Sequence, residues 1–72
     1  MIAMKLSARN VFKGKVKSLN EGPINAEVVV ELPGGQEVVA IITRTAAEGL
    51  GLSMGKQVFA VIKASNVILA VD

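Results

Sequence analysis

The sequence contains no cysteine and no histidine. It therefore has no disulfide bonds, and it lacks the thiolate and imidazole ligands on which zinc sites depend. A chain of 72 residues buries only about 60% of its unfolded surface, so folds of this size usually need a disulfide, a structural metal or association with another chain. Because this sequence has neither disulfides nor the ligands of a zinc site, we expect the chain to associate with another chain.

Aromatic residues are also scarce: Phe12 and Phe59 are the only two, and there is no tyrosine or tryptophan. Hydrophobic residues nevertheless make up 51% of the chain, most of them Val, Ile, Ala and Leu. A small monomer does not readily hide that much apolar surface. Part of it is expected to form the subunit interface of a symmetric homo-oligomer.

Long hydrophobic runs are missing as well. The longest, residues 58–62 and 67–71, are far shorter than the ~20 residues that a membrane-spanning helix needs. The first ten residues lack the apolar core of a signal peptide. The sequence therefore predicts a cytoplasmic protein without a membrane segment.

No acidic residue precedes Glu21, although five of the eight basic residues do: Lys5, Arg9, Lys13, Lys15 and Lys17. The net charge is only +2, so the uneven distribution matters more than the total. It favours attraction of an anion to the first part of the chain. The three lysines at alternate positions are also typical of a solvated strand face, so the charge alone leaves a polymer or a small ligand open.

Hydrophobic alternation and turn residues predict an all-β fold. Strands are expected over residues 11–19, 24–32, 36–43, 57–63 and 66–72, with a glycine-rich hairpin turn at 33–35 and a bend at Gly14. One short helix is expected over residues 45–51, where Thr45 and Glu48 match a capping box. This order is that of an OB-like five-stranded antiparallel barrel, with the helix between strands three and four.

Catalytic groups are hard to assemble from this sequence. The carboxylates are scattered, no phosphate-binding loop of the GxxxxGK[ST] type occurs, and no calcium-loop spacing is present. A serine–lysine arrangement from Ser7, Ser65 and Lys63 is the one nucleophile pattern left open. The sequence predicts a protein that is not an enzyme.

Hydrogen-bond donors for an oxyanion occur near both ends of the chain. Ser7, Arg9 and Asn10 provide a hydroxyl, a guanidinium and an amide, and Lys63, Ser65 and Asn66 provide similar donors. These segments converge if the first and last strands are neighbours. Taken singly, the same residues are also ordinary turn residues, so spacing leaves the pocket open. A nucleic-acid-binding OB module is the alternative, weakened by the shortage of aromatic residues for base stacking.

Three stretches together resemble the molbindin family of Mop-type, TOBE-domain proteins. They are MKLSARNVFKGKV near the start, GPINAEVVVEL in the middle, and ITRTAAEGLGLSMGKQVFAVIKASNVILA towards the end. The resemblance runs from Met4 onwards, and it implies that residues 4–72 form a single molybdate-binding domain and that residues 1–3 are an N-terminal extension.

The resemblance implies a cytoplasmic homo-oligomer, a hexamer built as a trimer of dimers, that serves in molybdenum storage or homeostasis. Molybdate, and tungstate as well, is bound as the intact oxyanion at subunit interfaces, without a catalytic cofactor or metal cation ligands. The implied binding residues are Ser7, Ala8, Arg9, Asn10, Lys63, Ala64 and Ser65. A second class of site is implied around Gly22, Ile24, Asn25 and Thr43.

Overall fold

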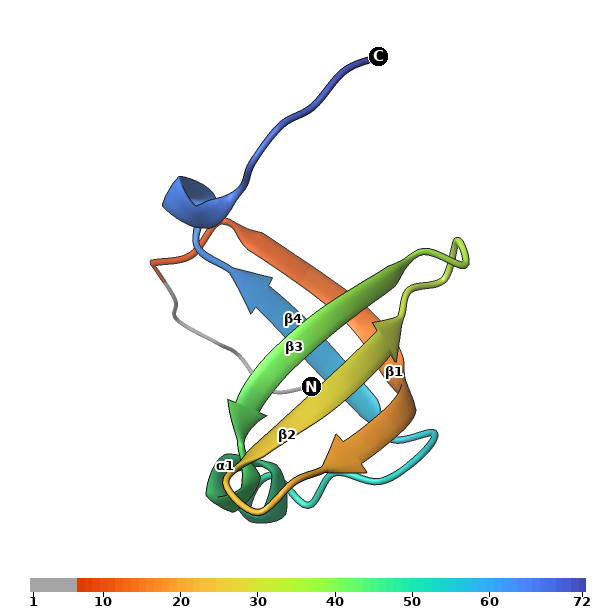
Figure 1. The fold of residues 1–72 in the computed structure, drawn as a ribbon. Coiled ribbons are helices and arrows are strands. Elements are labelled where there is room, and N and C mark those ends of the chain that lie inside the picture. Colours follow the sequence, from red (N-terminus) through yellow and green to blue (C-terminus); the bar gives the residue numbers. More distant parts are fainter. Residues whose placement is uncertain (1–6) are drawn as a thin grey trace.

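The fold is an antiparallel sheet curled into a half-barrel, with one short helix at its lower end (Figure 1). The structure, a computed structural model, describes residues 7–72, so the proposed extension at residues 1–3 lies outside the described part. The elements in chain order are β1 (Asn10–Glu21), β2 (Asn25–Glu31), β3 (Glu37–Thr43), α1 (Arg44–Gly49), β4 (Gln57–Ile62) and a 3-10 turn, η1 (Ala64–Asn66).

The spatial order of the strands is β3-β2-β1-β4, and neighbours in this order run antiparallel. Four predicted strands and the position of the helix between β3 and β4 are confirmed. The predicted strand at residues 66–72 is not present in the described chain. These residues follow η1 as an extended tail that points away from the sheet (Figure 1).

Strand β1 belongs to two ladders. Its first half, Asn10–Lys15, pairs with β4, and its second half, from Lys15 to Glu21, pairs with β2. The register slips between Val16 and Ser18, as at a β-bulge. The long strand thereby connects the two halves of the curled sheet.

Gly14 lies where β1 leaves β2. A Cβ atom at this position would lie 2.6 Å from the carbonyl oxygen of Glu31 and 2.8 Å from Cγ1 of Val30. Both distances are shorter than van der Waals contact, and one of the two atoms belongs to the backbone. The predicted bend at Gly14 therefore has a steric reason: only glycine lets the two strands approach this closely.

Gly14→Ala is expected to destabilise the fold by about 1–3 kcal/mol, since overpacking forces the backbone to shift. For a domain of this size, each kcal/mol lowers the midpoint of thermal unfolding by roughly 4–8 °C. Gly49→Ala is the matched control, because a Cβ at Gly49 in α1 meets nothing within 4 Å. Thermal unfolding followed by circular dichroism measures both variants. Equal midpoints for Gly14→Ala and the wild type would contradict this account of the bend.

The core is small and aliphatic. Val16, Val28 and Val30 are its fully buried centre. The half-buried residues packed against them are Leu19, Leu32, Val38, Ala40, Ile42, Leu52 and Val58. Thirteen large hydrophobic residues of the described chain remain exposed. A single copy therefore leaves much of its apolar surface in water, as the composition suggested.

The helix cap differs from the predicted one. Thr43, the last residue of β3, is the N-cap of α1, and its Oγ1 accepts a hydrogen bond of 3.0 Å from the Ala46 backbone N–H. The predicted capping box of Thr45 and Glu48 is wrong, because the helix begins at Arg44, directly after the strand. Glu48 instead pairs with Arg44, Nε to Oε2 at 3.3 Å, one helical turn earlier.

The end of α1 is held by Lys56. Its Nζ donates to the carbonyl oxygens of Leu50, at 2.7 Å, and Gly51, at 3.1 Å. A cation at these otherwise unpaired carbonyls stabilises a helix C-terminus. Within residues 7–72, neither α1 nor η1 has the length and apolar character that crossing a bilayer requires.

Candidate functional site

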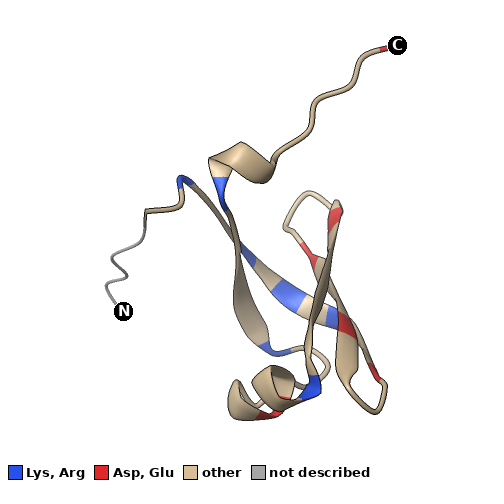
Figure 2. Cartoon of the chain, turned by 60° about the vertical axis from the view of Figure 1, so that its left-hand side comes forward, with Lys and Arg blue, Asp and Glu red and all other residues tan. Residues whose placement is uncertain are grey.

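The two donor segments predicted from the sequence lie at one end of the sheet. Asn10, the first residue of β1, is paired with Ile62, the last residue of β4. Arg9 therefore directly precedes this terminal pair on one strand, and Lys63 directly follows it on the other. Basic positions at the start of β1 and at the end of β4 are visible in Figure 2.

The second segment is shaped by η1. Lys63 is its N-cap residue, and the Asn66 N–H donates to the Lys63 carbonyl oxygen at 2.9 Å. The Val67 N–H donates to the Ala64 carbonyl oxygen at 3.3 Å. The tight turn keeps Lys63, Ala64 and Ser65 beside the end of β4.

The side chains of this end are accessible. Ser7, Arg9, Lys63 and Ser65 are exposed, while Ala8 and Asn10 are half-buried. The ion pairs found among the described residues are Lys17 with Glu37 and Arg44 with Glu48. Arg9 and Lys63 belong to neither, so their charges are not neutralised by a carboxylate of the described chain. The end of the β1–β4 ladder thus has two uncompensated positive charges.

Asn10 makes a contact that the sequence did not predict. Its Nδ2 donates to the carbonyl oxygen of Ile62, at 3.2 Å, although the residues are 52 positions apart. The amide group therefore binds the end of β4 directly. From the sequence, Asn10 was predicted to be an anion donor, and no local pattern indicates its contact with a residue so far along the chain.

The second predicted group lies at the opposite end of the sheet, near α1. Asn25 and Thr43 are paired across β2 and β3, and the Gly22 N–H donates to the Asn25 carbonyl oxygen at 2.7 Å. The Ile24 carbonyl oxygen accepts the Arg44 N–H at 2.8 Å. The structure thus brings Gly22, Ile24, Asn25 and Thr43 together, but at a distance from the first group.

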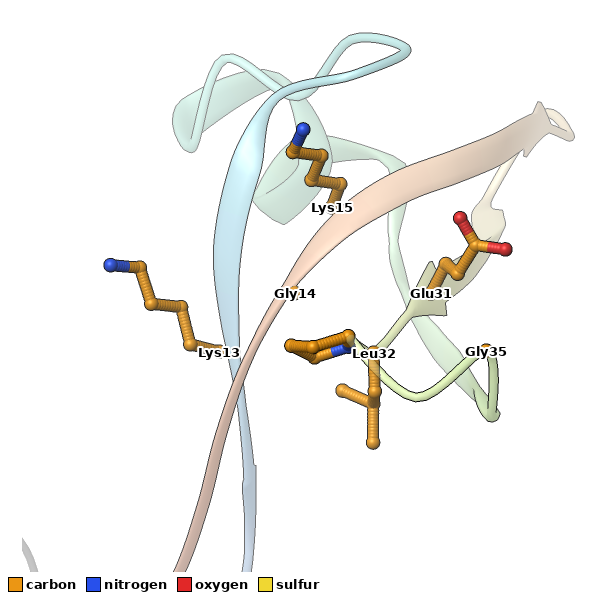
Figure 3. Close-up of a pocket in the computed structure, with 7 residues that line it drawn as sticks. Lys13, Gly14, Lys15, Glu31, Leu32 and Gly35 are labelled. Atoms are coloured by element: carbon orange, nitrogen blue, oxygen red, sulfur yellow. The ribbon is translucent and has the colours of Figure 1, made fainter.

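The lysines of β1 do not converge on one point. Two of them border a cavity of about 450 Å³, which is lined by Lys13, Gly14, Lys15, Glu31, Leu32, Pro33 and Gly35. Figure 3 shows the Lys13 and Lys15 side chains leaving β1 towards the same side, with their ends at separate places along the strand. Lys17 instead contacts the Glu37 carboxylate, which raises the pKa of Lys17 through the hydrogen bond and the opposite charge. These features fit the interpretation as a solvated strand face.

The open side of the half-barrel is apolar. A cavity of about 580 Å³ lies along β3 and β4, the two edge strands, and its lining is almost entirely Val, Ile, Leu, Ala and Phe. Among its residues are Val38, Ile42, Leu52 and Val58. The cavity lies where a further strand would close the sheet into a barrel. Sequence reasoning predicted that strand from this chain itself.

The carboxylates and the two phenylalanines are poorly placed to bind a metal ion or a nucleic acid. The described part of the chain contains no group of three His, Cys, Asp or Glu side chains placed to hold a metal ion. Phe12 is paired with Ala60 and Phe59 with Lys13, so adjacent register positions put the two rings on opposite faces of the sheet. They cannot form one platform for stacked bases, which weakens the nucleic-acid alternative further.

Together these features define a class: a small OB-like half-barrel with a donor-rich open end and an apolar gap between its edge strands. The chain belongs to the TOBE domain family, whose sequence pattern matches residues 6–69. The predicted resemblance is thereby confirmed.

Three similar proteins show the range of this family. The chain is 46% identical over 66 residues to molybdenum-pterin-binding protein 1 of Clostridium pasteurianum, covering 92% of this chain and 97% of that protein. It is 44% identical over 71 residues to the molybdenum transport protein ModE of Herbaspirillum seropedicae, covering 99% of this chain but only 26% of ModE. The chain therefore spans about a quarter of that relative.

A solved structure adds a bound ligand to the comparison. The cytoplasmic molybdate-binding protein ModG, with molybdate bound, superposes with a TM-score of 0.82 at 47% sequence identity. The match covers 92% of this chain and 53% of the ModG chain. The all-β fold with its single helix is thus the fold of a molybdate-binding relative.

Proposed function

We propose that this domain binds molybdate as the intact oxyanion, between the segments Ser7–Asn10 and Lys63–Ser65. The observation that carries the proposal is the terminal pair of Asn10 and Ile62, which brings both segments to one end of the β1–β4 ladder. Relatives that are named for molybdenum binding, together with ModG holding molybdate, support the choice of ligand.

The donors suit a tetrahedral dianion. Arg9 and Lys63 supply two positive charges, and Ser7 and Ser65 supply hydroxyl groups. Hydrogen bonds from charged donors to an anion are shorter and stronger than neutral ones. Ala8 and Ala64 contribute through their backbone N–H groups, since their side chains have no donor. Tungstate has the same charge and shape, so the same site accepts it.

The binding residues are incomplete in a single copy. Five of them are exposed, whereas an oxyanion is held strongly where donors surround it and water is excluded. We therefore place the site at an interface between subunits, where a second copy covers the open end. Binding at a shared interface also stabilises the assembly, because the ligand binds the associated state and not the separate chains.

The tail supports such an assembly. In one copy Ile68 is 92% exposed, Leu69 88% and Val71 98%. A run of apolar residues without alternation is typical of a strand buried on both faces. The six tail residues match the length of β4, which also has six residues. The tail of a second copy fits between β3 and β4, where it completes the barrel and fills the apolar cavity.

Repetition of this contact leads to a larger oligomer. Further contacts are available on the outer faces of the edge strands, where four apolar residues are exposed: Val39, Ile41, Phe59 and Val61. We propose the hexamer, a trimer of dimers, that the family resemblance implies. The second group, Gly22, Ile24, Asn25 and Thr43, then forms a separate class of anion site at the other end of each domain.

The proposed role is storage or homeostasis of molybdenum in the cytoplasm, without catalysis. The names of two relatives describe binding proteins, and the name of the third describes transport. Catalysis by a nucleophile requires a basic group hydrogen-bonded to it. Among the described residues, no serine of the two donor segments is hydrogen-bonded to such a base.

Equilibrium dialysis against molybdate alone, with molybdenum measured by elemental analysis, tests the proposed ligand. Retention of molybdenum without any added pterin is expected, and a matching experiment with tungstate is expected to give competition. Protein that retains molybdenum only when a pterin is supplied would contradict binding of the simple oxyanion. Binding of a single-stranded oligonucleotide in preference to molybdate would revive the nucleic-acid alternative.

A further inference from the structure

We propose that Asn10 is a positioning residue that holds the two halves of the anion site together, and that it is not itself a ligand. This inference rests on the proposed site between Ser7–Asn10 and Lys63–Ser65, and it changes the role of Asn10 within that site. It assigns a role to Asn10, whose side chain makes a hydrogen bond to the end of β4.

The contact joins the two strands at their last pair. Among the side-chain hydrogen bonds of residues 7–72, the bond from Asn10 Nδ2 to the Ile62 carbonyl oxygen is the one that connects β1 with β4. It lies at the terminal pair of the ladder, where strands separate most easily. A side-chain bond added at this position opposes that opening.

Opening of this pair would separate the proposed ligands. Arg9 adjoins Asn10, and Lys63 adjoins Ile62, so the separation between the two charged residues follows the separation of the terminal pair. Lys63 is also the N-cap of η1, whose internal bonds hold Ala64 and Ser65. The Asn10 amide therefore sets the starting position of the whole second segment.

The chemistry of the amide favours this role over direct ligation. An oxyanion repels the amide oxygen, which is an acceptor, and the amide nitrogen already donates one hydrogen to Ile62. Asn10 is half-buried and uncharged, whereas Arg9 and Lys63 are exposed and charged. The charged donors bind the anion, and the amide keeps them within reach of each other.

The test compares Asn10→Leu and Asn10→Ala with Asn20→Leu, an exposed asparagine near the other end of the same strand. Molybdate affinity is measured by titration calorimetry, and amide hydrogen exchange is measured without ligand. The Asn10 variants are expected to bind molybdate about three- to tenfold more weakly, as loss of one hydrogen bond implies. Their Asn66 and Val67 amides are expected to exchange faster than in the wild type. Asn20→Leu is expected to change neither quantity.

Two outcomes would overturn the inference. Unchanged affinity in a folded Asn10 variant would show that the amide has no role in binding. Weakened affinity with wild-type exchange at Asn66 and Val67 would show that Asn10 contacts the anion directly. Failure of the wild type to bind molybdate would instead remove the proposed function, while the exchange data would still decide whether the amide holds η1 in place.

Discussion

Arg9→Ala and Lys63→Ala are each expected to weaken molybdate binding by roughly ten- to a hundredfold, because each removes a charged hydrogen-bond donor, with a typical contribution of about 1.5–3 kcal/mol. Both residues lie at the terminal pair of the β1–β4 ladder, and neither belongs to the ion pairs found among the described residues. Their charges are thus available to the ligand. The double variant is expected to retain no measurable molybdate.

Lys13→Ala is the matched control for these variants. Lys13 is an exposed lysine on the same strand, but it lies on the outer face beside Phe59. Its removal changes the net charge as much as either site variant does, so it isolates long-range attraction from direct contact. Equilibrium dialysis on all the variants, with circular dichroism to confirm the fold, gives the comparison. Equal affinities for Lys13→Ala, Arg9→Ala and Lys63→Ala would contradict the proposed site.

Replacing two tail residues by lysine, as the double variant Ile68→Lys/Leu69→Lys, is expected to dissociate the oligomer. Adjacent residues of a strand point to opposite faces, so the pair places a charge on each face of the tail. Each substitution removes the burial of one aliphatic side chain, about 1.5–3 kcal/mol, and adds the cost of burying a charge. In the separate chain these residues are 92% and 88% exposed, so the monomer fold is expected to tolerate the change.

Asp72→Lys is the control for the tail variant, because it adds positive charge to the same segment without removing an apolar residue. Sedimentation velocity at micromolar concentration distinguishes monomers from oligomers. The double variant is expected to sediment as a monomer and to lose molybdate binding, whereas Asp72→Lys is expected to remain associated. An unchanged oligomer in the double variant would exclude the tail from the interface.

Much of the fold follows from local sequence patterns. The alternation in residues 11–19 and the β-branched run at 24–32 predict β1 and β2, because a half-buried strand needs one apolar face. The helix is correctly placed, but its cap is not. Local pattern matching favours Thr45 with Glu48, whereas the position of the cap depends on where β3 stops pairing with β2 at Thr43.

The predicted fifth strand illustrates the limit of a single sequence. Residues 67–71 have the composition of a buried strand, yet within the described chain they pair with no other strand and are exposed. Hydrophobicity shows that a segment is to be buried, but it does not show which chain covers it. The Asn10 contact is equally hard to predict, because its partner Ile62 lies 52 residues away and the sequence gives no local sign of the contact.

Native mass spectrometry of the protein, before and after exposure to molybdate, tests the central claim most directly, because one spectrum reports the oligomer and the number of anions bound to it. The account predicts an oligomer whose mass increases by whole numbers of molybdate ions, and which is retained at lower protein concentration when molybdate is present. A monomer that takes up no molybdate, or an oligomer whose mass is unchanged by it, would contradict the account.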